Sequence, residues 1–140
     1  MKTILKYVIL IGVSSTYAYI TEEGWGEPLI ALANSLHNKC VPITGVTQAS
    51  IDQVKEGNFI EDEKMKRYVL CLWLVSEVIS EKFELNTEIF KLLPKKLQDG
   101  HNIIGCTKKI NGTDVSELYE KTYSVTKCIQ KANPDEFIMF

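Results

Sequence analysis

The stretch EDEKMKRYVLCLWLVSEVI, residues 61–79, decides the fold. Its first three residues are acidic, and acidic side chains stabilise the positive N-terminal end of a helix. Behind them, apolar side chains recur at helical spacing along two stripes. One stripe is Met65, Val69, Leu72 and Ser76, and the other is Tyr68, Cys71, Val75 and Ile79. A helix that is apolar on nearly all sides is buried, so the stretch predicts a central helix that runs to Ile79.

Five further helical segments are predicted on either side of this helix. Apolar residues at three- and four-residue spacing define them, and Gly, Pro and Asn-Gly signals define their ends. They cover 28–37, 47–55, 87–97 with an interruption at Pro94, 101–110, and a last segment from Thr113 or Asp114 to about 131. Residues 41–45 are expected to break the first helix, and Asp114 with Glu117 to form a capping box on the last. The predicted fold class is therefore all-α, with about six helices.

The N-terminus has the layout of a secretory signal peptide. Lys2 and Lys6 precede an apolar run over 7–13, and Thr16 and Ala18 place small residues before a cut after Ala18. The run is too short to span a membrane, which takes about 20 residues. We expect a signal peptide over 1–18 and one secreted, extracellular domain over 19–140, with no membrane span.

Composition and motifs exclude several function classes. The 140 residues are 45% hydrophobic and 24% charged, with a formal charge of -2. Without a basic excess, phosphate neutralisation cannot drive nucleic-acid binding, so no nucleic acid is expected as a partner. No nucleophile elbow, zinc-protease motif, phosphate-binding loop or dinucleotide fingerprint is present. We therefore expect neither an enzyme nor a cofactor.

Four cysteines, one on each of four predicted helices, are the sharpest feature of the composition. They are Cys40, Cys71, Cys106 and Cys128. In a secreted chain disulfides are the default, and four cysteines allow three pairings that spacing alone cannot distinguish. A zinc site is not expected, because there is no C-x-x-C pair and no histidine at ligand spacing.

At these residues the chain resembles the insect odorant-binding and pheromone-binding proteins, in the subclass that lacks two of the family's six cysteines. Cys40, Cys71, Cys106 and Cys128 match the first, third, fourth and sixth. By the family's spacing, Arg67 stands where the second would be and Tyr119 where the fifth would be. Both absences fall on one bridge, so no orphan thiol is left.

The resemblance implies sequential pairing, Cys40 with Cys71 and Cys106 with Cys128. It also implies a six-helix fold that encloses an apolar cavity and carries a small, poorly soluble ligand through aqueous fluid. An odorant receptor is then a candidate further partner, and the protein is expected to be a monomer or weak homodimer. The alternative is a secreted helical signalling or interaction protein without a small-molecule cargo.

Ligand-binding residues are predicted from the apolar stripes, although such stripes are equally typical of an ordinary core. Trp73 combines an apolar face with an indole donor, and Thr122 and Ser76 are the candidate polar contacts, unless each hydroxyl bonds back to its own helix. The apolar tail 137–140 is expected to fold back as a wall or lid. The predicted set is Leu29, Leu32, Met65, Val69, Leu72, Trp73, Phe90, Leu93, Leu118, Thr122, Val125, Ile129, Phe137 and Phe140.

Two smaller expectations concern charged and titratable side chains. Arg67 and Tyr119 are expected to stack as a cation-π pair in place of the missing bridge. The two histidines, His37 and His101, are expected to be exposed residues at helix ends, so no pH switch is assigned to them.

Overall fold

The computed structural model describes residues 26–92, 95, 98, 102–137 and 139. These residues form six α-helices and one 3-10 turn, with no strand among them. The elements are α2 (Glu27–Thr44), α3 (Gln48–Lys55), α4 (Glu63–Val75), α5 (Thr87–Phe90), α7 (Ile103–Asn111), α8 (Leu118–Ala132) and η2 (Pro134–Glu136). The predicted all-α class and helix number are confirmed. The predicted signal peptide, 1–18, lies outside the described residues.

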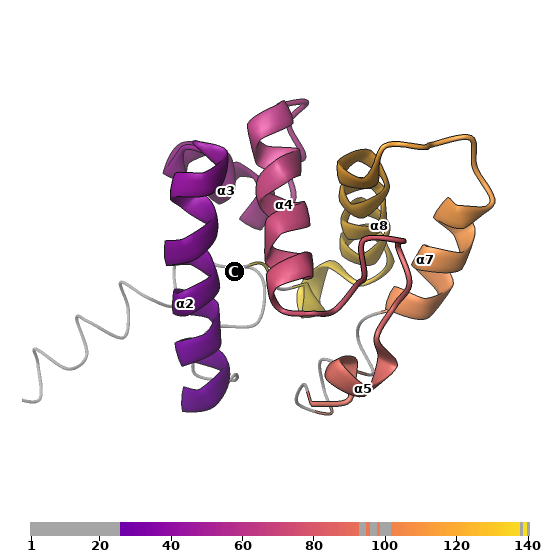
Figure 1. The fold of residues 1–140 in the computed structure, drawn as a ribbon, viewed down its shortest axis with the longest axis horizontal. Coiled ribbons are helices and arrows are strands. Elements are labelled where there is room, and N and C mark those ends of the chain that lie inside the picture. Colours follow the sequence, from indigo (N-terminus) through magenta and orange to yellow (C-terminus); the bar gives the residue numbers. More distant parts are fainter. Residues whose placement is uncertain (1–25, 93–94, 96–97, 99–101, 138, 140) are drawn as a thin grey trace, which may run out of the picture.

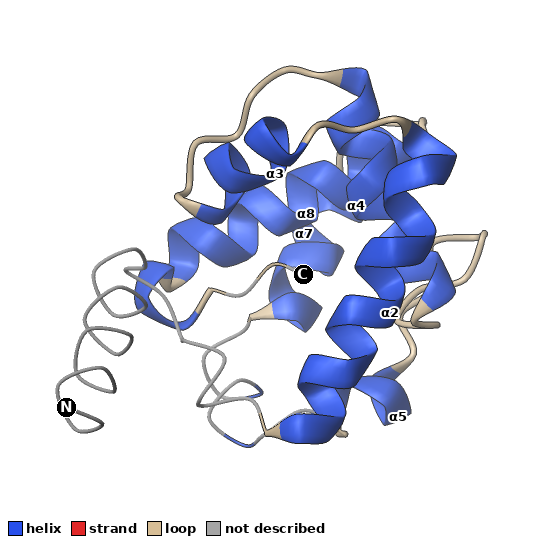
Figure 2. Ribbon diagram, turned by 90° about the vertical axis from the view of Figure 1, so that its left-hand side faces the viewer, coloured by secondary structure: helices blue, strands red, loops and turns tan. Residues whose placement is uncertain are grey.

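Helix α4 occupies the centre of the domain, as the opening stretch predicts. It packs against α2 on one side and α8 on the other, and α7 packs against the outer side of α8 (Figure 1). Turned by 90°, the same molecule shows α5 and the N-terminal end of α2 at one end of the domain, with the C-terminal segment between the helices (Figure 2). Met65, Tyr68 and Val69 of α4 are fully buried at this centre.

The first helix is longer than the sequence predicts. The expected break over 41–45 is wrong, because α2 continues through Pro42 to Thr44. Pro42 lies in the last turn, where its missing N–H leaves only the carbonyl of the exposed Asn38 without a helical donor. The helix instead ends at Gly45, whose φ of 70° is left-handed and whose N–H bonds to the Val41 carbonyl at 2.9 Å.

The central helix is shorter than predicted and ends at Val75 rather than Ile79. Glu77 has a φ of 63°, which no helix accommodates, and Ile79 then pairs with Leu85 in an isolated antiparallel bridge. Ile79 is buried from this loop, and Val75 is 38% exposed. The apolar residues after Val75 therefore keep helical spacing although they are not helical. The last turn of α4 is also not buried on every side.

Two other helix boundaries also differ from the prediction. Helix α5 stops at Phe90, well before the predicted end at 97, and the expected interruption at Pro94 lies outside the described residues. Helix α8 begins at Leu118, and Glu117 is its N-cap without a side-chain cap bond, so the capping box of Asp114 and Glu117 is not formed. The predicted start at Thr113 or Asp114 is too early, because these residues belong to the loop that connects the end of α7 to the start of α8.

Two disulfides join the four longest helices in two pairs. Cys40–Cys71 joins α2 to α4, and Cys106–Cys128 joins α7 to α8, with Cα–Cα distances of 5.8 and 5.7 Å. The sequential pairing implied by the resemblance is confirmed. The two disulfides close loops of 31 and 22 residues, and in the chain-entropy model each bridge stabilises the folded chain by roughly 3 to 4 kcal/mol.

Candidate functional site

An apolar pocket of about 290 Å³ lies where α2 begins and α4 ends. Two of its lining residues, Ser76 and Thr126, carry hydroxyls, and the others are aliphatic, aromatic or thioether side chains. Such a surface suits a hydrophobic molecule with few polar atoms. The lining residues are Pro28, Leu29, Leu32, Leu72, Trp73, Ser76, Val78, Ile89, Phe90, Leu92, Ile103, Thr126, Ile129, Phe137 and Met139.

The pocket has a buried floor and an exposed rim. Leu72, Ile103 and Ile129 are each 4% exposed and lie at the floor, supplied by α4, α7 and α8. Leu92 is 80% exposed and Leu32 is 44% exposed, so the rim is apolar and open to solvent. A molecule entering past Leu92 would therefore lose contact with water progressively.

Half of the sequence-predicted binding residues line this pocket. They are Leu29, Leu32, Leu72, Trp73, Phe90, Ile129 and Phe137. Leu93 and Phe140 lie outside the described residues. The remaining five belong to the hydrophobic interior or pack against it rather than lining the pocket, and they are Met65, Val69, Leu118, Thr122 and Val125.

Depth along the helices separates the predicted residues that line the pocket from those that do not. Met65 and Val69 lie in the N-terminal half of α4, where the buried rings of Tyr68 and Tyr123 fill the interior. The pocket opens one or two turns later, at Leu72 and Trp73. A helical stripe identifies which face of a helix is buried but not how far along the helix a pocket opens. The sequence therefore could not separate Met65 and Val69 from Leu72 and Trp73.

Seven other lining residues were not in the predicted binding set, although six of them lie in predicted helical segments and Met139 lies in the tail predicted to form a wall. Val78 follows the end of α4, and Leu92 follows α5. Ile89 and Ile103 lie in the predicted helical segments 87–97 and 101–110, but nothing in the sequence placed them at the pocket. The unpredicted lining residues are Pro28, Val78, Ile89, Leu92, Ile103, Thr126 and Met139.

The hydroxyls of the pocket are bonded to their own helices. Ser76 Oγ donates to the Trp73 carbonyl at 3.2 Å, and Thr126 Oγ1 donates to the Thr122 carbonyl at 2.8 Å. Thr122, the polar contact predicted from sequence, is fully buried outside the lining and donates to the Leu118 carbonyl at 2.8 Å. The open alternative, back-bonding to the helix, therefore holds for both predicted hydroxyls.

The C-terminal segment forms part of the pocket wall. Phe137 is 2% exposed and Met139 is 5% exposed, and both line the pocket. The Phe137 ring also contacts the Phe59 ring, with centroids 6.0 Å apart. These contacts tie the segment after η2 to the rest of the core.

Where the third bridge is missing, α4 and α8 are joined by non-covalent contacts. The Arg67 guanidinium lies 4.7 Å from the centre of the Tyr119 ring, so the expected cation-π pair is confirmed. Arg67 also bonds to Glu63, one turn earlier on α4, at 2.9 Å.

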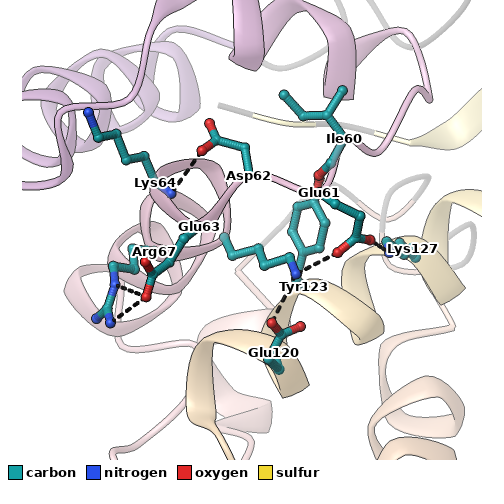
Figure 3. Close-up of polar contacts among 10 residues, drawn as sticks. Ile60, Glu61, Asp62, Glu63, Lys64, Arg67, Glu120, Tyr123 and Lys127 are labelled. Atoms are coloured by element: carbon teal, nitrogen blue, oxygen red, sulfur yellow. Dashed lines mark hydrogen bonds and ion pairs between the residues drawn. The ribbon is translucent and has the colours of Figure 1, made fainter.

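Beside this pair lies an ionic group that we call the Lys66 cluster, consisting of Lys66, Glu61, Glu120 and Lys127. Glu61 and Glu120 approach the same ammonium nitrogen from the loop before α4 and from α8 (Figure 3). The Lys66 Nζ distances are 2.6 Å to Glu61 and 2.9 Å to Glu120, and Lys127 adds a second contact to Glu61 at 2.9 Å. Because the Lys66 side chain is 10% exposed, its charge depends on these partners.

The contacts within the Lys66 cluster shift the pKa values of Glu61 and Lys66. Hydrogen bonds from Lys66 and then Lys127 lower the pKa of Glu61 to about 2. Hydrogen bonds to Glu61 and then Glu120 raise the pKa of Lys66 above its usual range. Burial raises the pKa of the neighbouring Tyr123 phenol to about 12, and its hydroxyl donates to the Ile60 carbonyl at 2.7 Å. Glu61 and Lys66 are therefore both ionised at neutral pH.

These shifts predict an acid-sensitive contribution to stability. Since the pKa of Glu61 is lower in the folded chain than the usual 4.5, its stabilising effect is present above about pH 5 and is lost as the pH falls toward 2. At pH 7, Glu61→Gln should melt roughly 2–4 °C below wild type, since exposed ion pairs contribute up to about 1 kcal/mol. The difference should shrink from pH 5 to pH 2 in thermal melts followed by circular dichroism.

Glu88→Gln is the matched control for this experiment. It breaks the surface ion pair between Glu88 of α5 and Lys91, the C-cap of that helix, in which both side chains are more than 60% exposed. Its melting temperature should follow wild type at every pH. A Glu61→Gln deficit that stays constant down to pH 2 would contradict the assigned pKa.

His37 does not lie where the sequence predicts. It is half-buried inside α2, and its Nδ1 lies 2.9 Å from the Tyr68 hydroxyl of α4, so its prediction as an exposed helix-end residue is wrong. Helix α2 continues past it, and the His37 ring meets the Tyr68 ring of α4 edge-on, with the ring centroids 6.1 Å apart. Burial raises the pKa of the Tyr68 phenol above its usual range. His101 lies outside the described residues.

The described residues contain neither a cluster of metal ligands nor a membrane-spanning helix. No three His, Cys, Asp or Glu side chains in this part of the chain are close enough to hold a metal ion. No helix among the described residues has the length and hydrophobicity to cross a membrane.

The fold and the pocket define a class: a small all-helical protein in which two disulfides join neighbouring helices around an apolar pocket. The profile of the PBP/GOBP family matches residues 23–132, and the chain therefore belongs to the PBP/GOBP family. Its two disulfides fit the four-cysteine subclass of the insect odorant-binding proteins. The resemblance drawn from the cysteines alone is confirmed.

Individual relatives agree with this assignment. The chain is similar to the B2 protein of Tenebrio molitor, with 26% identity over 131 residues, covering 93% of this chain and 94% of the relative. Odorant binding protein 4 of Chrysopa pallens, known from a crystal structure, is 26% identical with a TM-score of 0.65, over 86% of this chain and 99% of its own. Odorant binding protein 5 of Apis mellifera, at 17% identity, shares the fold, with a TM-score of 0.65 over 87% and 99% of the two chains.

Proposed function

We propose that this protein is a secreted carrier that holds a small hydrophobic ligand in its apolar pocket and moves it through aqueous fluid. The observation that carries the proposal is the pocket itself, whose floor is buried and whose rim is apolar. Membership in the PBP/GOBP family supports the same role. The predicted signal peptide over 1–18 and the two disulfides, which persist in oxidising compartments, support secretion.

Pocket volume limits the size of the ligand. At about 290 Å³ the pocket is roughly twice the ~150 Å³ cavity that holds a benzene molecule. We therefore expect ligands of about ten to twelve non-hydrogen atoms. The proposed activity is reversible binding without a chemical step, and a receptor that takes over the ligand is a further candidate partner.

A fluorescence experiment tests the carrier role. The chain has two tryptophans, and Trp25→Phe leaves Trp73 of the pocket as the only one. Medium-chain alcohols, ethers, esters and aldehydes should change Trp73 emission and displace the apolar dye N-phenyl-1-naphthylamine, because both reporters depend on the same apolar volume.

The control is a short homologue of each ligand with about four carbons, which buries less apolar area and should bind far more weakly. No response across the whole series, together with tight binding to a protein partner, would contradict the carrier role. That outcome would favour the signalling or interaction protein instead.

A further inference from the structure

Thr126 is the more buried of the two hydroxyl-bearing residues that line the pocket. It is 4% exposed and lies one helical turn before Ile129, a floor residue of α8. Ser76, the other lining hydroxyl, is only half-buried and lies at the end of α4. A polar atom of a ligand that reaches the floor would therefore meet Thr126 among hydrocarbon neighbours.

The hydroxyl of Thr126 is already committed as a donor. Its only hydrogen points to the Thr122 carbonyl at 2.8 Å, the same bond that Thr122 makes to Leu118 one turn earlier. A hydroxyl has one hydrogen and two acceptor lone pairs, so the group that remains for a ligand is an acceptor. Ser76 is in the same state, because it donates to the Trp73 carbonyl.

From this arrangement we infer that Thr126 Oγ1 accepts a hydrogen bond from a ligand hydroxyl, which makes aliphatic alcohols the ligand class that the pocket selects. The inference rests on the proposed carrier function and deepens it. The alcohol group lies at the floor beside Thr126, and the alkyl chain extends toward the rim at Leu92.

Ligands that can only accept hydrogen bonds fit this floor less well. An ether or ester oxygen would bring its lone pairs toward those of Thr126. It forms a hydrogen bond there only if Thr126 first breaks its own bond to the Thr122 carbonyl. Because an unmatched polar atom in an apolar site is unfavourable, the floor discriminates donors from acceptors.

The test uses Thr126→Val, which keeps the shape of the side chain and removes the hydroxyl. The probes are 1-decanol and methyl nonyl ether, which have equal numbers of non-hydrogen atoms and differ in the donor. Dissociation constants come from displacement of N-phenyl-1-naphthylamine. Thr126→Val should weaken 1-decanol about tenfold, the loss of one hydrogen bond, and change the ether less than about twofold.

Thr122→Val is the matched control. It removes a buried hydroxyl with the same bond to the preceding turn of α8, but Thr122 does not line the pocket. Both probes should bind it as they bind wild type. Comparing each probe across variants cancels the different solubilities of the alcohol and the ether.

Each outcome has a defined meaning. If Thr126→Val weakens both probes equally, or neither, the inference is overturned while the carrier function stands. If neither probe binds wild type, the carrier function itself has failed. Should Thr126→Val not fold, wild type alone decides, because 1-decanol must bind more tightly than the ether once each affinity is corrected for transfer from water to hexane, and equal corrected affinities overturn the inference.

Discussion

A chain truncated after Asp135 should bind N-phenyl-1-naphthylamine at least tenfold more weakly than the full chain. The truncation removes Phe137 and Met139, which line the pocket and are 2% and 5% exposed. Burying each of these side chains contributes about 1.5–3 kcal/mol, so losing both should also lower the free energy of unfolding by roughly 3–6 kcal/mol. Dye titration and urea unfolding measure the two effects.

A control separates the pocket wall from general loss of apolar surface. Leu92→Ala removes an apolar side chain that also lines the pocket but is 80% exposed. It should cost little stability and only a small part of the dye affinity. Unchanged dye affinity in a folded truncated chain would show that the C-terminal segment is not a wall of the binding site.

The double variant Arg67→Cys with Tyr119→Cys should melt at a markedly higher temperature than wild type and release its ligand more slowly. The new bridge would join α4 to α8 where the cation-π pair now lies and would close a loop of about 52 residues, worth roughly 4 kcal/mol in the chain-entropy model. Losing the cation-π pair offsets about 0.5–1 kcal/mol of this. Thermal melts and stopped-flow dye release measure the two effects.

Arg67→Ser with Tyr119→Ser is the control for this experiment, because it removes the same contacts and cannot form a bridge. It should melt slightly below wild type and release ligand at least as fast. Thiol titration of the cysteine variant reports whether the bridge has formed. Two free thiols in the folded protein would show that the two positions do not oppose each other closely enough for a disulfide.

The Lys66 cluster links the two helices that the missing bridge would join. It joins the loop before α4 to α8 through Glu61 and Glu120, directly beside the Arg67–Tyr119 pair. Sequence reasoning found the pair, because the resemblance marked both positions. It did not find the cluster, because Lys66 and Glu120 are far apart in the chain and charged residues on a helix are usually solvated.

Sequence reasoning succeeded where local chemistry decides structure. The predicted helix at 47–55 is present, and the structure adds that Thr47 caps it by accepting from Ser50. The predicted acidic start of α4 is also present, and Asp62 caps it. It failed at Pro42, where α2 continues past a local stop signal, and at the Asp114–Glu117 pattern, where α8 begins only after a local start signal. Tertiary contacts can supply more free energy than one cap or one lost hydrogen bond.

The sequence by itself determined the class of this protein: its apolar periodicity makes it all-helical, and its four cysteines place it in its family and subclass. Only the tertiary structure decided where the pocket lies and which of the two threonines of α8 lines it. Thr122 and Thr126 stand one turn apart on α8 with the same backbone bond, and nothing local distinguishes them. What distinguishes them is their position along α8 relative to the space that α2, α4 and the C-terminal segment leave open. A pocket forms where packing between distant elements ends, and sequence alone does not give that place.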